Sequence, residues 1–553
     1  MLVLNARKRN LRLVATCFRR FINCNSCGVQ LQSKDSSSVG FYLKPKTPEA
    51  KNLNSLEDVR YLLFSQELQS VKEGVPVGSL EDLKKAKSKP LICKRCSDSL
   101  YLNKYTKEDF PRFSFDQVLN YVPKNGNIIH VVPLPEFPFH VSKKALQGDE
   151  LTSTLVLTKG DQLAKDKATL QRKVSVFFKD FMKYHLGLTS NKIIATSALK
   201  KWNIRTVFSN MKASNYLLGD ANVGKSTLIN GLLREFMGYK VEVDRSGNVT
   251  MQQPLQDKRY DTQSFLKAQN AGVSHIPNMT RNLQAYKVSD KVICDLPGFT
   301  TNLQENDLDD IIRHEWLEKI RKTHQFKSEK LKKKTYISLK GTDNGGCLTV
   351  GGIFFLVPPP GSINQVVKYI PGPEYQFSNV TKALEVFKSC NESADHSLAK
   401  FCGIKPEVSK LDAYDRHVIP PFQGSIEIVF KDIGYILLRS TGKYNFTSPY
   451  EIWAPKGIQV CIREPLHLLI ESGFMKNVES SGTESACPRK RPLVSSTYIM
   501  PVEETKPLDR MKEMYLQRTQ NDLSSRRFAN ADPWEVVKNL RDEPPNLYWH
   551  YQW

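Results

Sequence analysis

The residues with the most specific chemistry form the stretch Gly219-Asp-Ala-Asn-Val-Gly-Lys-Ser226, which Thr227 follows. It fits the pattern G-x-x-x-x-G-K-[ST], in which backbone N–H groups of a glycine-rich turn and a helix N-terminus surround phosphate oxygens. In this pattern Lys225 reaches the β- and γ-phosphates of a nucleotide, and Ser226 ligates Mg²⁺. The residues expected to bind phosphate are Gly219, Asn222, Gly224, Lys225, Ser226 and Thr227.

An upstream tetrapeptide has the residue types that read a guanine base. Thr158-Lys-Gly-Asp161 resembles the [NT]-K-x-D motif of GTPases, in which the carboxylate accepts hydrogen bonds from N1–H and the 2-amino group of guanine. Adenine has no matching donors, so Asp161 would distinguish GTP from ATP. The aliphatic stem of Lys159 can lie along the base plane. Thr158 replaces the commoner Asn and weakens one support of the base site.

A second segment resembles the fifth motif of GTPases. Ser197-Ala-Leu-Lys200 follows an apolar run, and the resemblance implies that Ser197 and Ala198 lie beside the base. The backbone N–H of Ala198 would then meet the guanine O6 atom.

Two downstream segments resemble the switch regions of GTPases. Cys294-Asp-Leu-Pro-Gly298 resembles D-x-x-G, which implies that Asp295 holds Mg²⁺ through water and that the Gly298 amide senses the γ-phosphate. Thr280 is the expected switch threonine on Mg²⁺. The expected magnesium residues are Ser226, Thr280 and Asp295.

The residues near the γ-phosphate predict slow hydrolysis of GTP, with Lys225, Thr280 and Asn222 as the catalytic set. Phe299 stands where many GTPases have a glutamine that orients water, and an apolar side chain makes no hydrogen bond to water. Asn222 occupies the position of the cation-binding Asn of potassium-assisted GTPases; loop stabilisation is the equal alternative. For His275 we favour a structural or solvated role over a catalytic one.

Four cysteines have the spacing of a zinc site. Cys24-Asn-Ser-Cys27 and Cys93-Lys-Arg-Cys96 form two C-x₂-C pairs, and four thiolates match tetrahedral Zn²⁺. The 65 residues between the pairs exceed the spacing of typical zinc ribbons. The alternative is four unrelated buried or free cysteines.

Apolar runs must position these motifs. Candidate strands at 127–132, 153–158, 191–196, 215–218 and 291–293 alternate with candidate helices at 167–184 and 227–236. This alternation predicts a parallel sheet with helices on both faces and ligands at the carboxyl ends of the strands. Residues 335–475 have a β-rich pattern, 480–491 a loop pattern, and 505–542 a charged helical pattern.

The order of the motifs is informative, because the base-reading segments precede the phosphate loop and the switches come last. This order, together with the two cysteine pairs, resembles the YqeH-type circularly permuted GTPases of the YlqF/YawG group, over roughly residues 22–320. The resemblance implies a permuted α/β G domain whose switch leads directly into the C-terminal part, so that nucleotide state is transmitted as a domain movement. The expected parts are a mitochondrial presequence (1–21), a zinc knuckle module with an insert (22–110), the circularly permuted G domain (111–320), a β-rich C-terminal recognition domain (321–480), and a loop and helical tail (481–553).

Composition narrows the partners. The 553 residues carry a formal net charge of +23, which favours RNA or an acidic membrane surface. Residues 1–34 are Arg-rich and lack Asp and Glu, which is typical of a mitochondrial presequence; an RNA-binding arm is the alternative. The basic run 327–334 suits RNA contact or a solvated helix end. No apolar run has membrane-spanning length, and eleven cysteines in a chain this long do not form a disulfide scaffold.

The leading hypothesis is a GTPase of the mitochondrial matrix that uses GTP/GDP, Mg²⁺, Zn²⁺ and K⁺. Its expected partner is the assembling small ribosomal subunit and its rRNA, and its role is rRNA maturation. An alternative follows from a further resemblance, of the presequence, the insert between the cysteine pairs, the C-terminal half and residues 546–553, to a fungal mitochondrial family. It makes the chain a regulatory protein peripherally associated with the inner membrane and linked to lipid metabolism and prohibitins. A third hypothesis, motivated by Phe299, is a nucleotide-dependent scaffold with negligible turnover.

Overall fold

The computed structural model describes residues 23–553 except for 44–90, 103, 107–108, 125, 147–153, 190–191, 244–248, 253–269, 274–275, 301–307, 323–335, 393–399, 423, 442–447, 490 and 520–545. The expected presequence, His275 and the basic run 327–334 lie outside the described residues. Within the described part of the chain, none of the helices combines the length and apolar composition needed to cross a membrane.

An eight-stranded sheet carries most of the predicted motifs, in the order β3-β2-β1-β4-β8-β7-β5-β6. Five neighbouring strands are parallel: β3 (Lys192–Ala195), β2 (Thr154–Thr158), β1 (Asn127–Pro133), β4 (Ser214–Leu218) and β8 (Lys291–Asp295). Three antiparallel strands extend the sheet: β7 (Gln284–Val288), β5 (Tyr239–Val243) and β6 (Val249–Gln252). Every residue of β1 and β2 is buried, which is typical of strands covered on both faces.

Helices cover both faces of this sheet because alternate strand residues point in opposite directions. Val156 and its neighbours pack against α7 (Ile204–Ser209) and α8 (Lys225–Phe236). Leu155 and Leu157 pack on the other face, against one continuous helical segment. That segment contains α5 (Lys167–Thr169), the π-helical turn η5 (Leu170–Val174), α6 (Ser175–Phe181) and the π-helical turn η6 (Met182–Leu186). Shorter helices are α2 (Lys94–Leu102), α3 (Phe115–Leu119), η3 (Leu134–Glu136), α4 (Lys143–Leu146) and η4 (Gly160–Gln162).

The C-terminal part contains two six-stranded antiparallel sheets that share one apolar core. The first sheet has the order β13 (Glu374–Phe377), β10 (Cys347–Val350), β11 (Phe355–Val357), β17 (Glu451–Pro455), β14 (Tyr414–Val418) and β20 (Tyr498–Met500). The second has the order β19 (Val494–Ser496), β18 (Val460–Arg463), β15 (Ser425–Phe430), β16 (Gly434–Ser440), β12 (Ile363–Tyr369) and β9 (Ile337–Lys340). Helical elements here are α13 (Val380–Glu392), η8 (Pro406–Val408), η9 (Leu411–Ala413), α14 (Leu466–Glu479) and α15 (Pro507–Arg518).

The expected boundary at residue 480 does not separate two modules. Strands β19 and β20 lie beyond it, yet each pairs into one of the two C-terminal sheets. The exposed loop that the sequence predicted at 480–491 is confirmed at 481–484, which are exposed. It is wrong farther along, because Ala486 and Cys487 are buried and Asp180 of α6 accepts hydrogen bonds from Ser485 and Ala486. The long-range strand pairing decides this, and local composition does not reveal it.

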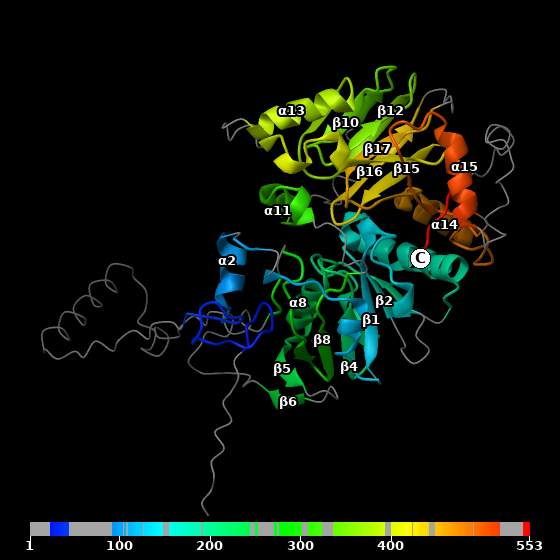
Figure 1. The fold of residues 1–553 in the computed structure, drawn as a ribbon. Coiled ribbons are helices and arrows are strands. Elements are labelled where there is room, and N and C mark those ends of the chain that lie inside the picture. The colour runs from blue at the N-terminus through cyan, green and yellow to red at the C-terminus, as the bar shows by residue number, and fades with distance from the viewer. Residues whose placement is uncertain are drawn as a thin grey trace, which may run out of the picture.

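Figure 1 shows the eight-stranded sheet and the C-terminal sheets as two bodies, with α11 (His314–Lys322) at their junction. The short helix α10 (Leu308–Ile311) precedes it. Trp316 of α11 is buried in the C-terminal core, where its ring contacts Gly351, Gly372 and Gly403 so closely that a Cβ atom at any of them would lie within 3 Å of it. The helix that follows the D-x-x-G segment is therefore anchored in the C-terminal part.

Candidate functional site

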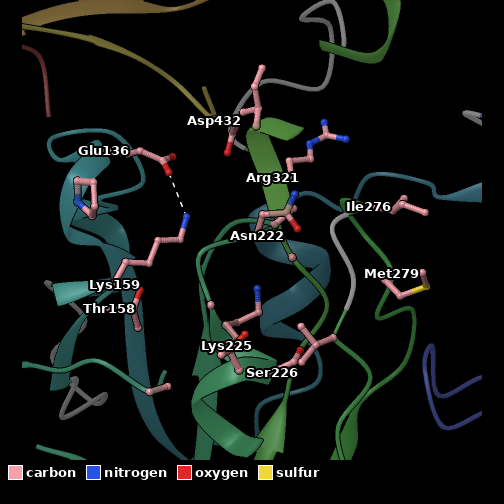
Figure 2. A pocket seen from close by; sticks show the side chains of 18 of the residues that line it. Glu136, Thr158, Lys159, Asn222, Lys225, Ser226, Ile276, Met279, Arg321 and Asp432 are labelled. Atoms are coloured by element: carbon pink, nitrogen blue, oxygen red, sulfur yellow. Dashed lines mark hydrogen bonds and ion pairs between the residues drawn. The ribbon is translucent and has the colours of Figure 1, made fainter. Parts of the chain in front are cut away.

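The predicted motifs converge at the carboxyl end of the parallel strands, around a cavity of about 480 Å³ (Figure 2). Ten of the residues predicted to bind nucleotide or magnesium line this cavity, together with Thr158: Lys159, Asp161, Ala198, Asn222, Gly224, Lys225, Ser226, Thr227, Thr280 and Gly298. The other three, Gly219, Ser197 and Asp295, stand one hydrogen bond behind this lining. Segments from five separate parts of the chain therefore form one site.

The phosphate loop has the tight backbone that its glycines predict. A Cβ atom at Gly219 would lie 2.5 Å from the carbonyl oxygen of Val131, so a side chain is excluded there. Asn222 and Gly224 both adopt left-handed backbone angles, with φ of 58° and 100°. Lys225 begins α8, and its Nζ atom donates to the carbonyl oxygens of Gly219 at 2.8 Å and Asp220 at 2.7 Å. Burial lowers the pKa of Lys225, while nearby carboxylates oppose this shift.

Three oxygen-bearing side chains form a group suited to Mg²⁺, which prefers oxygen ligands. The hydroxyl of Ser226 donates to Asp295 Oδ2 at 2.7 Å. Asp295 Oδ1 is buried and has no hydrogen-bond partner among the described residues, and burial raises the pKa of this carboxyl. Thr280 lies at the same cavity and is also buried. A buried carboxylate oxygen without a partner is what a site for a hard cation requires, so these residues fit magnesium.

The expected base-reading loop is tied to the phosphate loop. Thr158 donates a hydrogen bond of 2.5 Å to the carbonyl oxygen of Val223, within the phosphate loop. Asp161 Oδ1 accepts from the hydroxyl of Ser197 at 2.5 Å, so Ser197 orients the carboxylate. Thr158, which the sequence suggested would weaken the base site, therefore connects the two loops directly.

A buried ion-pair cluster that was not predicted from the sequence borders the site. His140 Nδ1 lies 2.7 Å from Asp220 of the phosphate loop, and its Nε2 lies 3.0 Å from Glu136 and 3.7 Å from Asp432 of the C-terminal part. Glu136 also pairs with Lys159, at 3.1 Å. Burial by itself lowers the pKa of His140, but the three carboxylates raise it to about 10. No local pattern marks His140, because its partners come from three separate segments.

Phe299 is a core residue. It is 1% exposed and packs edge-on against Phe115, with 5.2 Å between the ring centroids. Its backbone bridges to Phe113 and to Asp220, at the start of the phosphate loop. The ring therefore fixes the D-x-x-G segment against the sheet and lies outside the lining of the main cavity.

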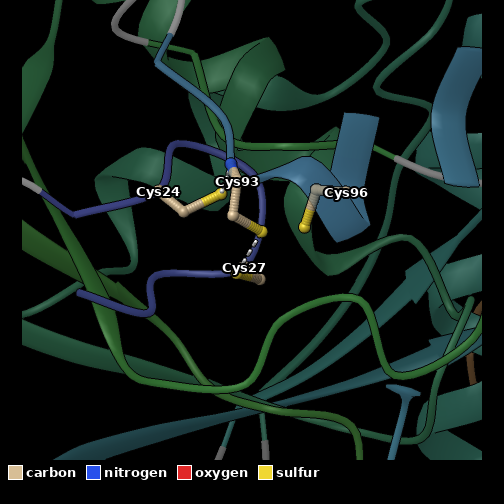
Figure 3. A group of neighbouring side chains, drawn as sticks. All are labelled: Cys24, Cys27, Cys93 and Cys96. Atoms are coloured by element: carbon tan, nitrogen blue, oxygen red, sulfur yellow. Dashed lines mark hydrogen bonds between the residues drawn. The ribbon is translucent and has the colours of Figure 1, made fainter. Parts of the chain in front are cut away.

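The two cysteine pairs form one cluster (Figure 3). The sulfur atoms of Cys24, Cys27, Cys93 and Cys96 all lie within 4.8 Å of one another, and those of Cys27 and Cys93 are 4.0 Å apart. Tetrahedral zinc with bonds of about 2.3 Å places its sulfur ligands about 3.8 Å apart. The four thiolates therefore fit Zn²⁺, and all four cysteines are buried.

The cysteine cluster packs directly on the segment that carries Thr280. The carbonyl oxygen of Cys27 accepts from the backbone N–H groups of Arg281 at 3.0 Å and Asn282 at 3.3 Å. Gln284 donates to the Ser26 carbonyl at 3.1 Å, and Cys96 Sγ lies 3.6 Å from Met279 Sδ. The residues on both sides of Thr280 are thus held by the segments that carry the four cysteines.

Comparisons with known proteins identify the family. The model of the genetic interactor of prohibitins 3 N-terminal domain matches residues 23–110, and that of the C-terminal domain matches residues 334–539. The relatives are named "Genetic interactor of prohibitins 3, mitochondrial". The one from Zygosaccharomyces rouxii is 55% identical over 98% of this chain and 96% of the relative. The one from Vanderwaltozyma polyspora is 52% identical over 96% of this chain and 95% of the relative. The relative from Saccharomyces cerevisiae strain S288c is 49% identical over 96% of each chain. The expected mitochondrial location and the resemblance to a fungal mitochondrial family are confirmed: this mitochondrial protein belongs to the genetic interactor of prohibitins 3 family.

Proposed function

We propose that this protein binds and hydrolyses GTP, and that its eight-stranded sheet is a circularly permuted G domain of the YqeH type. One observation carries the proposal: the base-reading segments, the phosphate loop and both switch segments meet at a single cavity, although their order along the chain is permuted. Ligands of open parallel sheets bind at the carboxyl ends of the strands, which is where this cavity lies.

Each residue has a defined task in this proposal. Lys225 and the N-terminus of α8 hold the phosphates, and Asp161, oriented by Ser197, accepts from the guanine edge. Ser226, Thr280 and Asp295 would hold Mg²⁺, which when bound neutralises phosphate charge. The four cysteines would hold structural Zn²⁺, and Asn222 is the residue available to a potassium ion.

Substitution of Asp161 tests the nucleotide specificity. Asp161→Asn loses two hydrogen bonds from guanine to a charged acceptor, each worth about 1.5–3 kcal/mol, so GTP affinity should fall by roughly 10²- to 10⁴-fold. Binding of xanthosine triphosphate should improve, because the amide can donate to the xanthine 2-oxo group. Fluorescent GTP, ATP and XTP analogues provide the measurement. Asp166→Asn is the matched control, since Asp166 caps α5 and an Asn keeps that cap.

Equal affinity of the wild-type protein for GTP and ATP would refute the base-reading assignment. Normal GTP binding by Asp161→Asn would refute it as well. Measurable binding without single-turnover hydrolysis, with or without potassium and RNA, would instead identify a nucleotide-dependent scaffold.

We further propose that the GTPase acts in the mitochondrial matrix during assembly of the small ribosomal subunit and maturation of its rRNA. The net charge of +23 and the resemblance to permuted GTPases support an RNA partner. Lys225→Ala should then deplete mature small-subunit rRNA in mitochondria. Normal rRNA and normal sedimentation of the subunit in that variant would rule this role out.

A second candidate role is supported by the relatives, whose name describes a genetic interactor of prohibitins. In this role the protein associates peripherally with the inner membrane and regulates prohibitin-dependent organisation and lipid metabolism. Fractionation of mitochondria separates the two roles: co-sedimentation with membranes after a high-salt wash favours this one, and co-sedimentation with the small ribosomal subunit favours the first.

A further inference from the structure

Arg321, near the end of α11, is a buried cation with unused hydrogen-bond donors. Its side chain is 7% exposed, and its Nη2 atom donates to Asp309 Oδ2 at 3.3 Å. Its Nε and Nη1 atoms are buried and have no hydrogen-bond partner among the described residues. Leaving buried donors of a charged group without acceptors is costly, because they lose their hydrogen bonds to water. Such a group points to a ligand that accepts these bonds.

The position of Arg321 identifies which part of a ligand it faces. It lines the main cavity and also a smaller adjoining cavity of about 100 Å³, and Asn222 and Asn278 line both with it. In Figure 2, Arg321 lies on the Asn222 side of the cavity, across from Lys159. Asn222 belongs to the phosphate loop, whereas Lys159 belongs to the base-reading loop. Arg321 therefore borders the phosphate end of the site.

Asp309, the carboxylate paired with Arg321, leaves part of the positive charge of Arg321 available to a ligand. Asp309 Oδ1 also accepts from the hydroxyl of Tyr105, at 2.9 Å, so this carboxylate is shared between two donors. The guanidinium is planar and always charged, and its remaining N–H groups match the geometry of phosphate oxygens.

We propose that Arg321 binds the γ-phosphate of GTP and acts as a catalytic residue supplied from within the same chain. This inference rests on the proposed GTPase function. In the reaction, the oxygen of water forms a bond to the γ-phosphorus while the bond to the β–γ bridging oxygen breaks. That electron pair stays on GDP, and the proton of the water leaves with the released phosphate. Arg321 stays protonated throughout and stabilises the charge on the γ-phosphoryl oxygens.

The position of Arg321 depends on the C-terminal part, because Trp316 anchors α11 there. Trp316 lies five residues before Arg321 on the same helix and is fixed in the C-terminal core. A movement of the C-terminal sheets would therefore move the arginine relative to the phosphate loop. Binding of a partner to those sheets thus has a direct route to the rate of hydrolysis.

The test compares Arg321→Gln and Arg321→Lys with Lys319→Ala, which removes one positive charge from an exposed position of the same helix. Each full-length variant is assayed for thermal melting, for affinity toward GDP and a non-hydrolysable GTP analogue, and for single-turnover hydrolysis. We expect Arg321→Gln to hydrolyse GTP roughly 10³-fold more slowly than wild type. Its affinity should fall about tenfold for the GTP analogue and change less than about twofold for GDP. Arg321→Lys keeps the charge but not the planar fork and should recover only part of the rate.

The outcomes separate the two proposals. If neither the wild-type protein nor Lys319→Ala binds a guanine nucleotide, the proposed GTPase function is overturned, and this inference with it. Normal nucleotide binding and an Arg321→Gln variant that matches Lys319→Ala in rate and in GTP-to-GDP preference would overturn only the role of Arg321. If hydrolysis by the wild type is too slow to detect, the role of Arg321 is tested by binding alone: the variant should lose the preference for the GTP analogue over GDP. If Arg321→Gln fails to fold, the same binding measurement is made on Arg321→Lys.

Discussion

Removal of the metal from the cysteine cluster should weaken binding of GTP much more than binding of GDP. The knuckle contributes three hydrogen bonds to the segment around Thr280, from Arg281, Asn282 and Gln284. At about 0.5–1.5 kcal/mol each, they restrain that segment by roughly 2–4 kcal/mol. If the cluster holds structural zinc as proposed, the knuckle should lose its fold without the metal, because such sites supply folding energy.

This restraint sets an upper limit on the effect. Since each 1.4 kcal/mol is a factor of ten, a loss of 2–4 kcal/mol corresponds to roughly 30- to 700-fold weaker binding of GTP with Mg²⁺. GDP offers Thr280 no γ-phosphate, so GDP affinity should change by less than about threefold. We therefore expect Cys93→Ser to lose bound zinc and to lose most of its preference for GTP over GDP.

The assay titrates fluorescent GDP and a non-hydrolysable GTP analogue against wild type, Cys93→Ser and the control Cys390→Ala, with zinc content measured by a colorimetric chelator. Cys390 lies in α13, outside the cluster. A zinc-free Cys93→Ser protein with an unchanged GTP-to-GDP ratio would show that the knuckle does not restrain Thr280. An equal loss of affinity for GDP and for the GTP analogue would show that the knuckle supports the whole domain.

Three further predictions concern stability and pH. Trp316→Ala should lower the free energy of unfolding by about 3–5 kcal/mol in a urea titration, because the ring fills a buried site bounded by glycines; a loss below about 1 kcal/mol would contradict the packing. Arg463→Met should cost about 3–5 kcal/mol, because Glu427, 2.7 Å from Arg463 Nε, would be left buried without its main cation. The double variant Arg463→Met/Glu427→Met should recover much of this loss, and a double variant as unstable as the single would refute the charge-based explanation. The stability that His140 contributes is measured as the difference in free energy of unfolding between wild type and His140→Gln. This contribution should be complete below pH 6.5 and decline as pH rises toward 10, because the folded state holds the proton on His140. The charged groups around the ring are Glu136, Asp220 and Asp432, with Lys159 and Lys431 also nearby. A contribution that is constant from pH 6 to 10 would contradict a protonated His140.

The local motifs were predictable because their chemistry depends on residue type and short spacing. The Gly219–Ser226 loop follows β4 as the pattern requires, and Asp161 and Asp295 lie at or just beyond strand ends. The two C-x₂-C pairs likewise form the cluster that their spacing predicted, with Cys24 and Cys27 on a turn and Cys93 and Cys96 at the start of α2. Apolar runs were sufficient to predict strands, since a strand buried on both faces leaves a continuous apolar signal.

The tertiary structure decided which separated residues meet. His140, Arg321 and Arg463 carry no local pattern, because each gains a partner from another element: Arg321 from α10, His140 from the distant phosphate loop, and Arg463 from the distant turn at Pro135 and Phe137. The contact between the cysteine cluster and the Thr280 segment is of the same kind. Sequence spacing determines which groups a short segment presents, whereas the packing of sheets and helices determines which group lies opposite, and that packing depends on the whole core at once.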